Sequence, residues 1–124
     1  MRILCIDDDS DALSYHKALL ERRGYDVLIA ASAREGLRLA AVCPIAAVVV
    51  DYHMPEMNGH EVATEIKRIR PRVPIVMVSS DNAIPELVLD AVDAFVPKDE
   101  AHILLLPLID QICDESRSRL PAGT

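Results

Sequence analysis

Acidic side chains follow two short apolar runs of this sequence, at points where groups from different runs could act together. Asp7, Asp8 and Asp9 come directly after one run, and Asp51 comes after another. Carboxylates held close together repel one another unless a cation neutralises them. Carboxylate oxygens suit Mg²⁺, which binds through one or two carboxylates and keeps water and phosphate oxygens as its other ligands. The acids therefore predict a Mg²⁺ site that can receive a phosphoryl group.

A nucleophile and two groups that neutralise charge complete this set. Asp51 could be the nucleophile, since aspartyl phosphates are known covalent intermediates. Ser79 and Lys98 follow two further apolar runs, and a hydroxyl and an amine in these places can bind phosphoryl oxygens. Either residue alone is better explained as a loop serine or a surface lysine. Their shared position after consecutive runs favours a joint role in stabilising the charge of a phosphoryl group.

The apolar runs that carry these groups indicate five buried strands that alternate with helices. Each run is short and rich in Val or Ile, which is typical of strands in a parallel sheet. Cap and stop signals, such as Gly24 and the box Ser32-x-x-Glu35, separate the runs. This alternation predicts a doubly wound, three-layer α/β/α domain, in which ligands bind beyond the carboxyl ends of the strands. We expect strands at 3–6, 27–30, 46–50, 75–78 and 94–96, and helices near 10–23, 33–42, 59–69, 85–91 and 100–115.

Composition narrows the classes of protein that fit. The 124 residues suit one domain with one ordinary core. The net charge of −7, with Lys and Arg scattered apart from a short run at 67–72, disfavours direct binding of nucleic acid. No apolar run approaches the roughly 18 residues of a membrane span. Three cysteines lie far apart, at Cys5, Cys43 and Cys113, which indicates reduced thiols in a cytoplasmic protein.

Three segments resemble the bacterial response-regulator receiver family. They are residues 6–9 (Ile-Asp-Asp-Asp), residues 48–59 around Asp51, and residues 74–80 at the fourth expected strand. The Asp-x-x-Met-Pro-x-Met-Asn-Gly motif that begins at Asp51 is the most specific of the three, and the resemblance covers essentially the whole chain. It implies a flavodoxin-like (βα)5 fold, with a five-stranded parallel sheet in the order 2-1-3-4-5.

By this resemblance, the protein is a signalling switch and not a metabolic enzyme. A sensor histidine kinase, or a histidine phosphotransfer protein, would transfer a phosphoryl group to Asp51, and the domain would catalyse only its own phosphorylation and dephosphorylation. The Mg²⁺ ligands would be the side chains of Asp8 and Asp51, the backbone carbonyl of His53, and Asp7 acting through water. Lys98 would pair with the phosphoryl oxygens.

Ser79 and Phe95 look like the switch pair of the family. The hydroxyl would move toward the phosphoryl group while the aromatic ring turns inward, which changes the affinity for an output partner that the sequence does not identify. The loop that follows departs from the family pattern, because Pro97 precedes Lys98 and Asp99 stands where the family usually has proline. Pro97 restrains the backbone before Lys98 and could aim its amine without a cis peptide after it.

Two prolines affect the last two helices. Pro85 falls where the fourth helix would begin, so we expect that helix to be short, and Pro107 predicts a kink or a late start in the last helix. Both departures lie on the face that many receivers use for dimerisation or output, so a homodimer is left open. The receiver domain would span 1–116, and 117–124 would be a flexible tail or the start of a linker.

Two other functions stay open as alternatives. One is a pseudo-receiver, an interaction module that works without phosphorylation, which the altered fourth helix favours. The other is a haloacid-dehalogenase-like phosphatase, because Asp7-x-Asp9 after an apolar strand also resembles the nucleophile motif of those enzymes. The chain leaves no room for the cap domain of such a phosphatase, and a module without chemistry has no need of like charges at one edge of a sheet. Phosphorylation of Asp51 is therefore the favoured hypothesis.

Overall fold

The computed structural model describes residues 1–81 and 84–118. The strands are β1 (Arg2–Ile6), β2 (Asp26–Ala30), β3 (Ala47–Asp51), β4 (Ile75–Ser79) and β5 (Ala94–Pro97). The helices are α1 (Ser10–Glu21), α2 (Ala33–Val42), α3 (Gly59–Ile69), α4 (Glu86–Asp90) and α5 (Ala101–Ser118), and a 3₁₀ turn, η1 (Lys98–Glu100), comes before α5. Every expected strand and helix is present, close to its predicted bounds.

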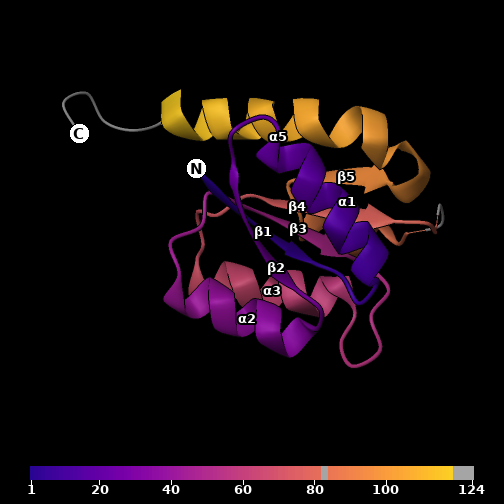
Figure 1. The fold of residues 1–124 in the computed structure, drawn as a ribbon. Coiled ribbons are helices and arrows are strands. Elements are labelled where there is room, and N and C mark those ends of the chain that lie inside the picture. The colour runs from indigo at the N-terminus through magenta and orange to yellow at the C-terminus, as the bar shows by residue number, and fades with distance from the viewer. Residues whose placement is uncertain (82–83, 119–124) are drawn as a thin grey trace.

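The five strands form one sheet in the order β2-β1-β3-β4-β5, and each neighbouring pair is parallel. Figure 1 shows α1 and α5 together on one face of this sheet and α2 and α3 on the other. Parallel strands joined by helices on both faces are the arrangement that the alternating pattern predicted. The α/β class, the three layers and the flavodoxin-like strand order are therefore confirmed.

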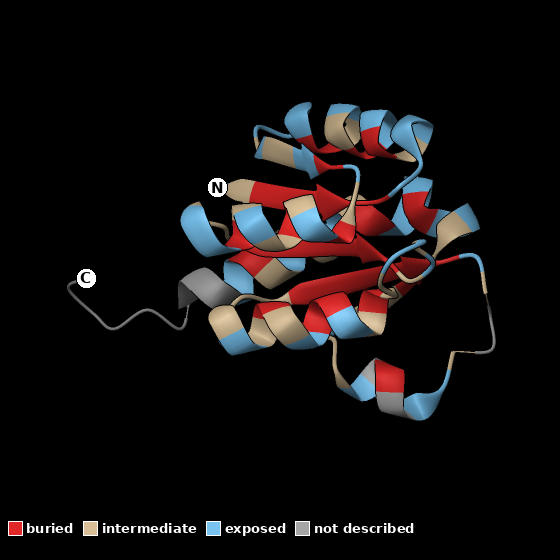
Figure 2. Cartoon of the chain, turned by 90° about the horizontal axis from the view of Figure 1, so that it is seen from below, coloured by how far each residue is buried: buried red, intermediate tan, exposed pale blue. Residues whose placement is uncertain are grey.

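The sheet carries an apolar layer on each face, because successive side chains along a strand point to opposite sides. Ile3 and Cys5 of β1 pack with residues of α1 and α5, whereas Leu4 and Ile6 pack with residues of α2 and α3. Every residue of β3 and of β4 is buried, and Figure 2 shows the buried positions concentrated along the strands between the helices. The ends of these central strands are therefore held by packing on both faces.

Polar side chains begin the helices that flank the carboxyl edge of the sheet. Asp9 caps α1, where its carboxylate accepts hydrogen bonds from backbone N–H groups of the first turn. Ser32 caps α2, and Asn58 caps α3 in a reciprocal pair of bonds with Glu61. Gly24, with φ of +98°, follows α1 in the left-handed region that glycine adopts without strain. These local signals fix where α1, α2 and α3 begin, and where α1 ends, relative to the strands.

The last two helices differ in how well the sequence anticipated them. The short fourth helix is confirmed, since α4 spans only Glu86–Asp90. A late start of the last helix is wrong, because α5 begins at Ala101 directly after η1 and continues through Pro107 to Ser118. Residues 119–124 of the predicted tail lie outside the described residues. Among the described helices, none is both long enough and apolar enough to cross a membrane.

Candidate functional site

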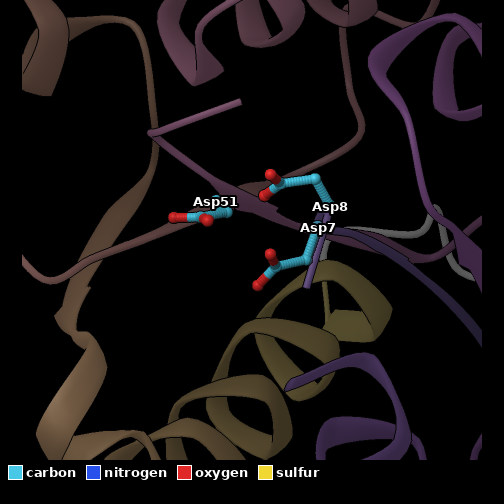
Figure 3. A group of neighbouring side chains, drawn as sticks. All are labelled: Asp7, Asp8 and Asp51. Carbon is cyan, nitrogen blue, oxygen red and sulfur yellow. The ribbon is translucent and has the colours of Figure 1, made fainter. Parts of the chain in front are cut away.

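Three carboxylates meet at the carboxyl ends of β1 and β3. Asp51 is the last residue of β3 and Asp7 follows β1 directly, while the residues before them, Ile6 and Val50, pair across the two strands. Asp7 and Asp51 are buried, whereas Asp8 is exposed. One carboxylate oxygen from each acid lies within 4.8 Å of the others, and Figure 3 shows the three side chains side by side at this edge. The structure therefore brings the three predicted acids together.

Lys98 follows β5 and contributes a positive charge to this group. Its Nζ lies 3.3 Å from Oδ2 of Asp7 and 3.4 Å from Oδ2 of Asp51. Pro97, with φ of −60° and ψ of 135°, holds the backbone extended immediately before it, and the described residues contain no cis peptide bond. The amine that was predicted to meet phosphoryl oxygens thus already lies between two carboxylates.

Burial makes the charge on Asp51 unfavourable. Burial, followed by the negative charge of Asp7, raises the pKa of Asp51 to about 6, and Lys98 acts in the opposite direction. Burial alone would lower the pKa of Lys98, but the charges of Asp51 and Asp7 raise it above its ordinary value. One amine faces a group of three acids, so the site keeps a negative charge that a cation could neutralise.

Ser79 is the last residue of β4 and its side chain is completely buried. Because β4 lies beside β3, with Val78 paired to Asp51, the hydroxyl belongs to the same edge of the sheet. Ser79 Oγ accepts a hydrogen bond from the backbone N–H of Asp81 at 3.0 Å. Ser79 is therefore at the predicted place, and its hydroxyl oxygen accepts a hydrogen bond from the loop that follows β4.

Phe95 lies within β5, opposite Met77 of β4. Its half-buried side chain lines a surface pocket of about 300 Å³ together with residues of α5, among them Leu104 and Pro107. The structure thus places Phe95 beside α5 and not among the carboxylates. The inward turn of the ring that a switch would require stays a prediction.

His53 and Asp81 meet beyond the ends of β3 and β4. The backbone N–H of His53 donates to Asp51 Oδ1 at 3.4 Å, and its exposed imidazole places Nε2 3.7 Å from Oδ2 of Asp81. Asp81 was not among the residues predicted for the site. Its one signal in the sequence was its spacing, because Asp81 follows Ser79 by two positions just as His53 follows Asp51.

Gly59 brings the start of α3 against the backbone of the acceptor strand. Its N–H donates to the carbonyl oxygen of Tyr52 at 2.8 Å. A Cβ atom at this position would lie 2.7 Å from both the carbonyl oxygen of Asp51 and the Cα of Tyr52. No side chain fits without moving one of these backbone segments, so the Asn-Gly pair of the sequence motif sets how closely α3 approaches Asp51.

The donor atoms of this edge suit a small, hard cation. Mg²⁺ takes octahedral oxygen ligands at about 2.0–2.1 Å, which places opposite ligands about 4 Å apart. The oxygens of Asp7, Asp8 and Asp51 lie within 4.8 Å of one another, and the exposure of Asp8 leaves room for water. The three acids present therefore fit Mg²⁺.

Sequence relatives of this chain include response regulators and transcriptional regulatory proteins. A sequence model of the response regulator receiver domain matches residues 3–107. The transcriptional regulatory protein GlrR of Escherichia coli (strain K12) is 30% identical over 117 residues, which cover 92% of this chain and 26% of GlrR. The response regulator MprA of Mycolicibacterium vanbaalenii is 35% identical over 101 residues, which cover 79% of this chain and 44% of MprA. The chain spans less than half the length of these two relatives.

Solved structures of receiver domains share the whole fold. A CheY-like receiver domain protein from Methanospirillum hungatei JF-1 matches with a TM-score of 0.90 and 33% identity, over 96% of this chain and 98% of that one. The response regulator TrrA of Thermotoga maritima, in complex with Mg²⁺-BeF, matches with a TM-score of 0.84 and 26% identity, over 90% of this chain and 97% of TrrA. Together with the family match over residues 3–107, these likenesses show that the chain belongs to the response regulator receiver domain family.

Proposed function

We propose that Asp51 accepts a phosphoryl group from the phosphohistidine of a sensor histidine kinase or a histidine phosphotransfer protein, in a reaction that depends on Mg²⁺. The observation that carries this proposal is the buried carboxylate of Asp51, placed beside two further acids and an amine at one edge of the sheet. Residues 1–116 would act as a cytoplasmic switch that catalyses only its own phosphorylation and dephosphorylation.

The transfer exchanges one covalent bond for another. A carboxylate oxygen of Asp51 attacks the phosphorus, the P–N bond of the phosphohistidine breaks, and its electron pair stays on the imidazole nitrogen, which takes up a proton. Attack of water on the same phosphorus later returns the carboxylate and inorganic phosphate. With a pKa of about 6, Asp51 is mostly ionised and nucleophilic near neutral pH. Lys98, 3.4 Å from Asp51, is near enough to stabilise the charge of the phosphoryl oxygens.

Mg²⁺ would be held by the side chains of Asp8 and Asp51 and by the backbone carbonyl of His53, with Asp7 acting through water. When bound, the cation would neutralise the acids and polarise the phosphoryl oxygens. The mutual spacing of the three acids supports this assignment. The complex of TrrA with Mg²⁺-BeF supports it by likeness, at 26% identity.

Ser79 and Phe95 would carry the change from the acceptor to an output partner. Ser79 lies one strand away from Asp51, so a small movement of its hydroxyl would reach a phosphoryl oxygen on Asp51. The pocket that Phe95 lines with α5 would change shape when the ring turned inward. The altered surface would be bound by an output protein or domain, or by a second copy of this domain.

The structure weakens the phosphatase alternative, because the second acid of its motif has another task. The carboxylate of Asp9 accepts hydrogen bonds from the N–H groups of Asp11 at 3.0 Å and Ala12 at 3.4 Å, as the cap of α1. A capping carboxylate satisfies helix N–H groups that would otherwise lack a partner. Asp9 is thereby drawn toward the helix and away from the role of a second catalytic acid beside Asp7.

Incubation with acetyl phosphate and Mg²⁺, followed by rapid quench and intact mass measurement, tests the proposal. We expect a mass gain of one phosphoryl group that is lost with Asp51→Asn and with a chelator. Asp9→Asn is the matched control, because it keeps a capping side chain and should keep the adduct, whereas a mechanism that used Asp7 and Asp9 would lose it. Absence of an adduct in folded protein that binds Mg²⁺ would instead favour the pseudo-receiver.

A further inference from the structure

Two exposed side chains join the loops that follow β3 and β4. Nε2 of His53 lies 3.7 Å from Oδ2 of Asp81, and the two side chains are 55% and 44% exposed. The contact therefore lies on the solvent side of the edge that carries Asp51 and Ser79. It adds a side-chain contact between the two loops to the backbone hydrogen bond from Tyr52 N–H to the carbonyl oxygen of Val78, at 2.9 Å, which joins them at the ends of their strands.

The backbone N–H groups of the same two residues hold the acceptor and the hydroxyl. The N–H of His53 donates to Asp51 Oδ1 at 3.4 Å, and the N–H of Asp81 donates to Ser79 Oγ at 3.0 Å. Movement of Ser79 Oγ toward a group on Asp51 would stretch its bond to Asp81. A side-chain contact that anchors Asp81 to His53 resists any accompanying movement of the loop.

We propose that His53 and Asp81 form a latch that stabilises the unphosphorylated arrangement of these two loops and opens when a phosphoryl group occupies Asp51. The inference rests on the proposed function of Asp51. Two effects favour opening: the hydroxyl of Ser79 is drawn toward the phosphoryl oxygens, and the new double negative charge repels the carboxylate of Asp81.

A contact that exists in only one of two states shifts the equilibrium toward that state by the free energy of the contact. Exposed charged pairs measured in other proteins correspond to about a twofold to fivefold change in an equilibrium constant. The latch should therefore weaken the binding of a phosphoryl group, or of an analogue, by about twofold to fivefold.

Beryllofluoride, an analogue of the phosphoryl group, allows this bias to be measured without chemistry. We would titrate it, in the presence of Mg²⁺ and at one fixed pH, into the wild type, His53→Ala, Asp81→Ala and the double variant, and follow binding by calorimetry. Because either single change removes the same contact, the double variant should gain less affinity than the product of the two single effects, by about twofold to fivefold. This coupling should shrink in about 0.5 M salt, because salt screens exposed charges.

A matched control separates the latch from the general charge of the loops. Glu56 is an exposed acid in the same loop as His53, so Glu56→Ala combined with Asp81→Ala should give additive effects. If an alanine variant fails to fold by circular dichroism, His53→Gln and Asp81→Asn repeat the cycle with side chains of similar size.

The outcomes distinguish the latch from the function on which it rests. Additive effects of the His53 and Asp81 changes, or a double variant that gains more than the product, would overturn the latch alone. A folded wild type that binds Mg²⁺ but no beryllofluoride would overturn the proposed function, and the latch with it.

Discussion

At the scale of single residues, the acceptor shows how the site depends on charge. Asp51 is buried next to Asp7, and these surroundings raise its pKa from 3.8 to about 6. At pH values between these two pKa values, Asp51 binds a proton more readily in the folded protein than in the unfolded chain. The stability that this group contributes is therefore complete below about pH 4 and is lost as the pH rises through about 6.

The variant Asp51→Asn should raise the free energy of unfolding of the metal-free protein by about 1–3 kcal/mol near pH 7, with no gain near about pH 4. Urea denaturation of both proteins with a chelator, across this range of pH, measures the difference. Saturating Mg²⁺ should reduce this difference in the free energy of unfolding, because the cation binds the carboxylate of the wild type more tightly than the amide of the variant and so stabilises the wild type more. If the difference in the free energy of unfolding between the two proteins did not change with pH, the surroundings of Asp51 would not disfavour its charge.

A second prediction concerns the close approach of α3 to the acceptor. Gly59→Ala should lower the free energy of unfolding by about 1–3 kcal/mol, because the added Cβ would lie 2.7 Å from the backbone of Asp51 and Tyr52. It should also slow formation of the adduct, since relief of the overlap displaces Asp51. Urea denaturation and the rate of mass gain with acetyl phosphate measure the two effects.

Gly36→Ala is the matched control for this change. Its Cβ would meet Cδ1 of Ile6 at 2.5 Å and Cγ1 of Ile6 at 2.8 Å, which are side-chain atoms and not backbone. Ile6 can shift, and alanine gains about 1 kcal/mol over glycine in a helix, so the loss of stability should be smaller and the rate of mass gain should not change. Equal rates for the two variants would contradict the positioning role of Gly59.

At the scale of elements, α5 shows packing prevailing over local preference. The helix continues through Pro107, although proline removes a hydrogen bond to the carbonyl of Ile103 and crowds it. Ile103 and Pro107 both face solvent, so water can bind the freed carbonyl. Leu105 and Ile109, on the opposite side of the same turns, are completely buried, and the burial of these side chains holds the helix together.

Pro107→Ala should therefore raise the free energy of unfolding by about 1–3 kcal/mol, because it restores the missing bond without changing the buried face. Thermal or urea denaturation measures this gain. Pro55→Ala, in an exposed loop, is the control and should bring no gain, since it only adds freedom to the unfolded chain. A loss of stability with Pro107→Ala would show instead that the proline ring packs favourably in the pocket beside Phe95.

At the scale of the whole molecule, regular patterns were predictable and irregular segments were not. The strand ends that gather Asp7, Asp51 and Lys98 follow from the positions of the apolar runs and from the geometry of parallel sheets, while the strand order came from the family resemblance. The contact of His53 with Asp81 had only the matching spacing of these residues after Asp51 and Ser79 as a signal, because no periodicity specifies the path of an irregular loop. The late start suggested by Pro107 was wrong for a different reason, since a local proline signal says nothing of the burial that outweighs it.

The last prediction concerns the sheet as a barrier between two apolar layers. Ile109 packs with the α1 and α5 layer and Ile66 with the α2 and α3 layer, and both are completely buried. Ile→Val at either position should cost about 0.5–1.5 kcal/mol, and the double variant should lose the sum to within about 0.5 kcal/mol, since the sheet lies between the two sites. The double variant with Ile3→Val and Ile109→Val is the comparison. Both residues belong to the same layer, so their effects can be coupled. Coupling above about 1 kcal/mol across the sheet, measured by urea denaturation, would show that the layers repack together, and that a change near α5 can reach α3 and the acceptor through the core.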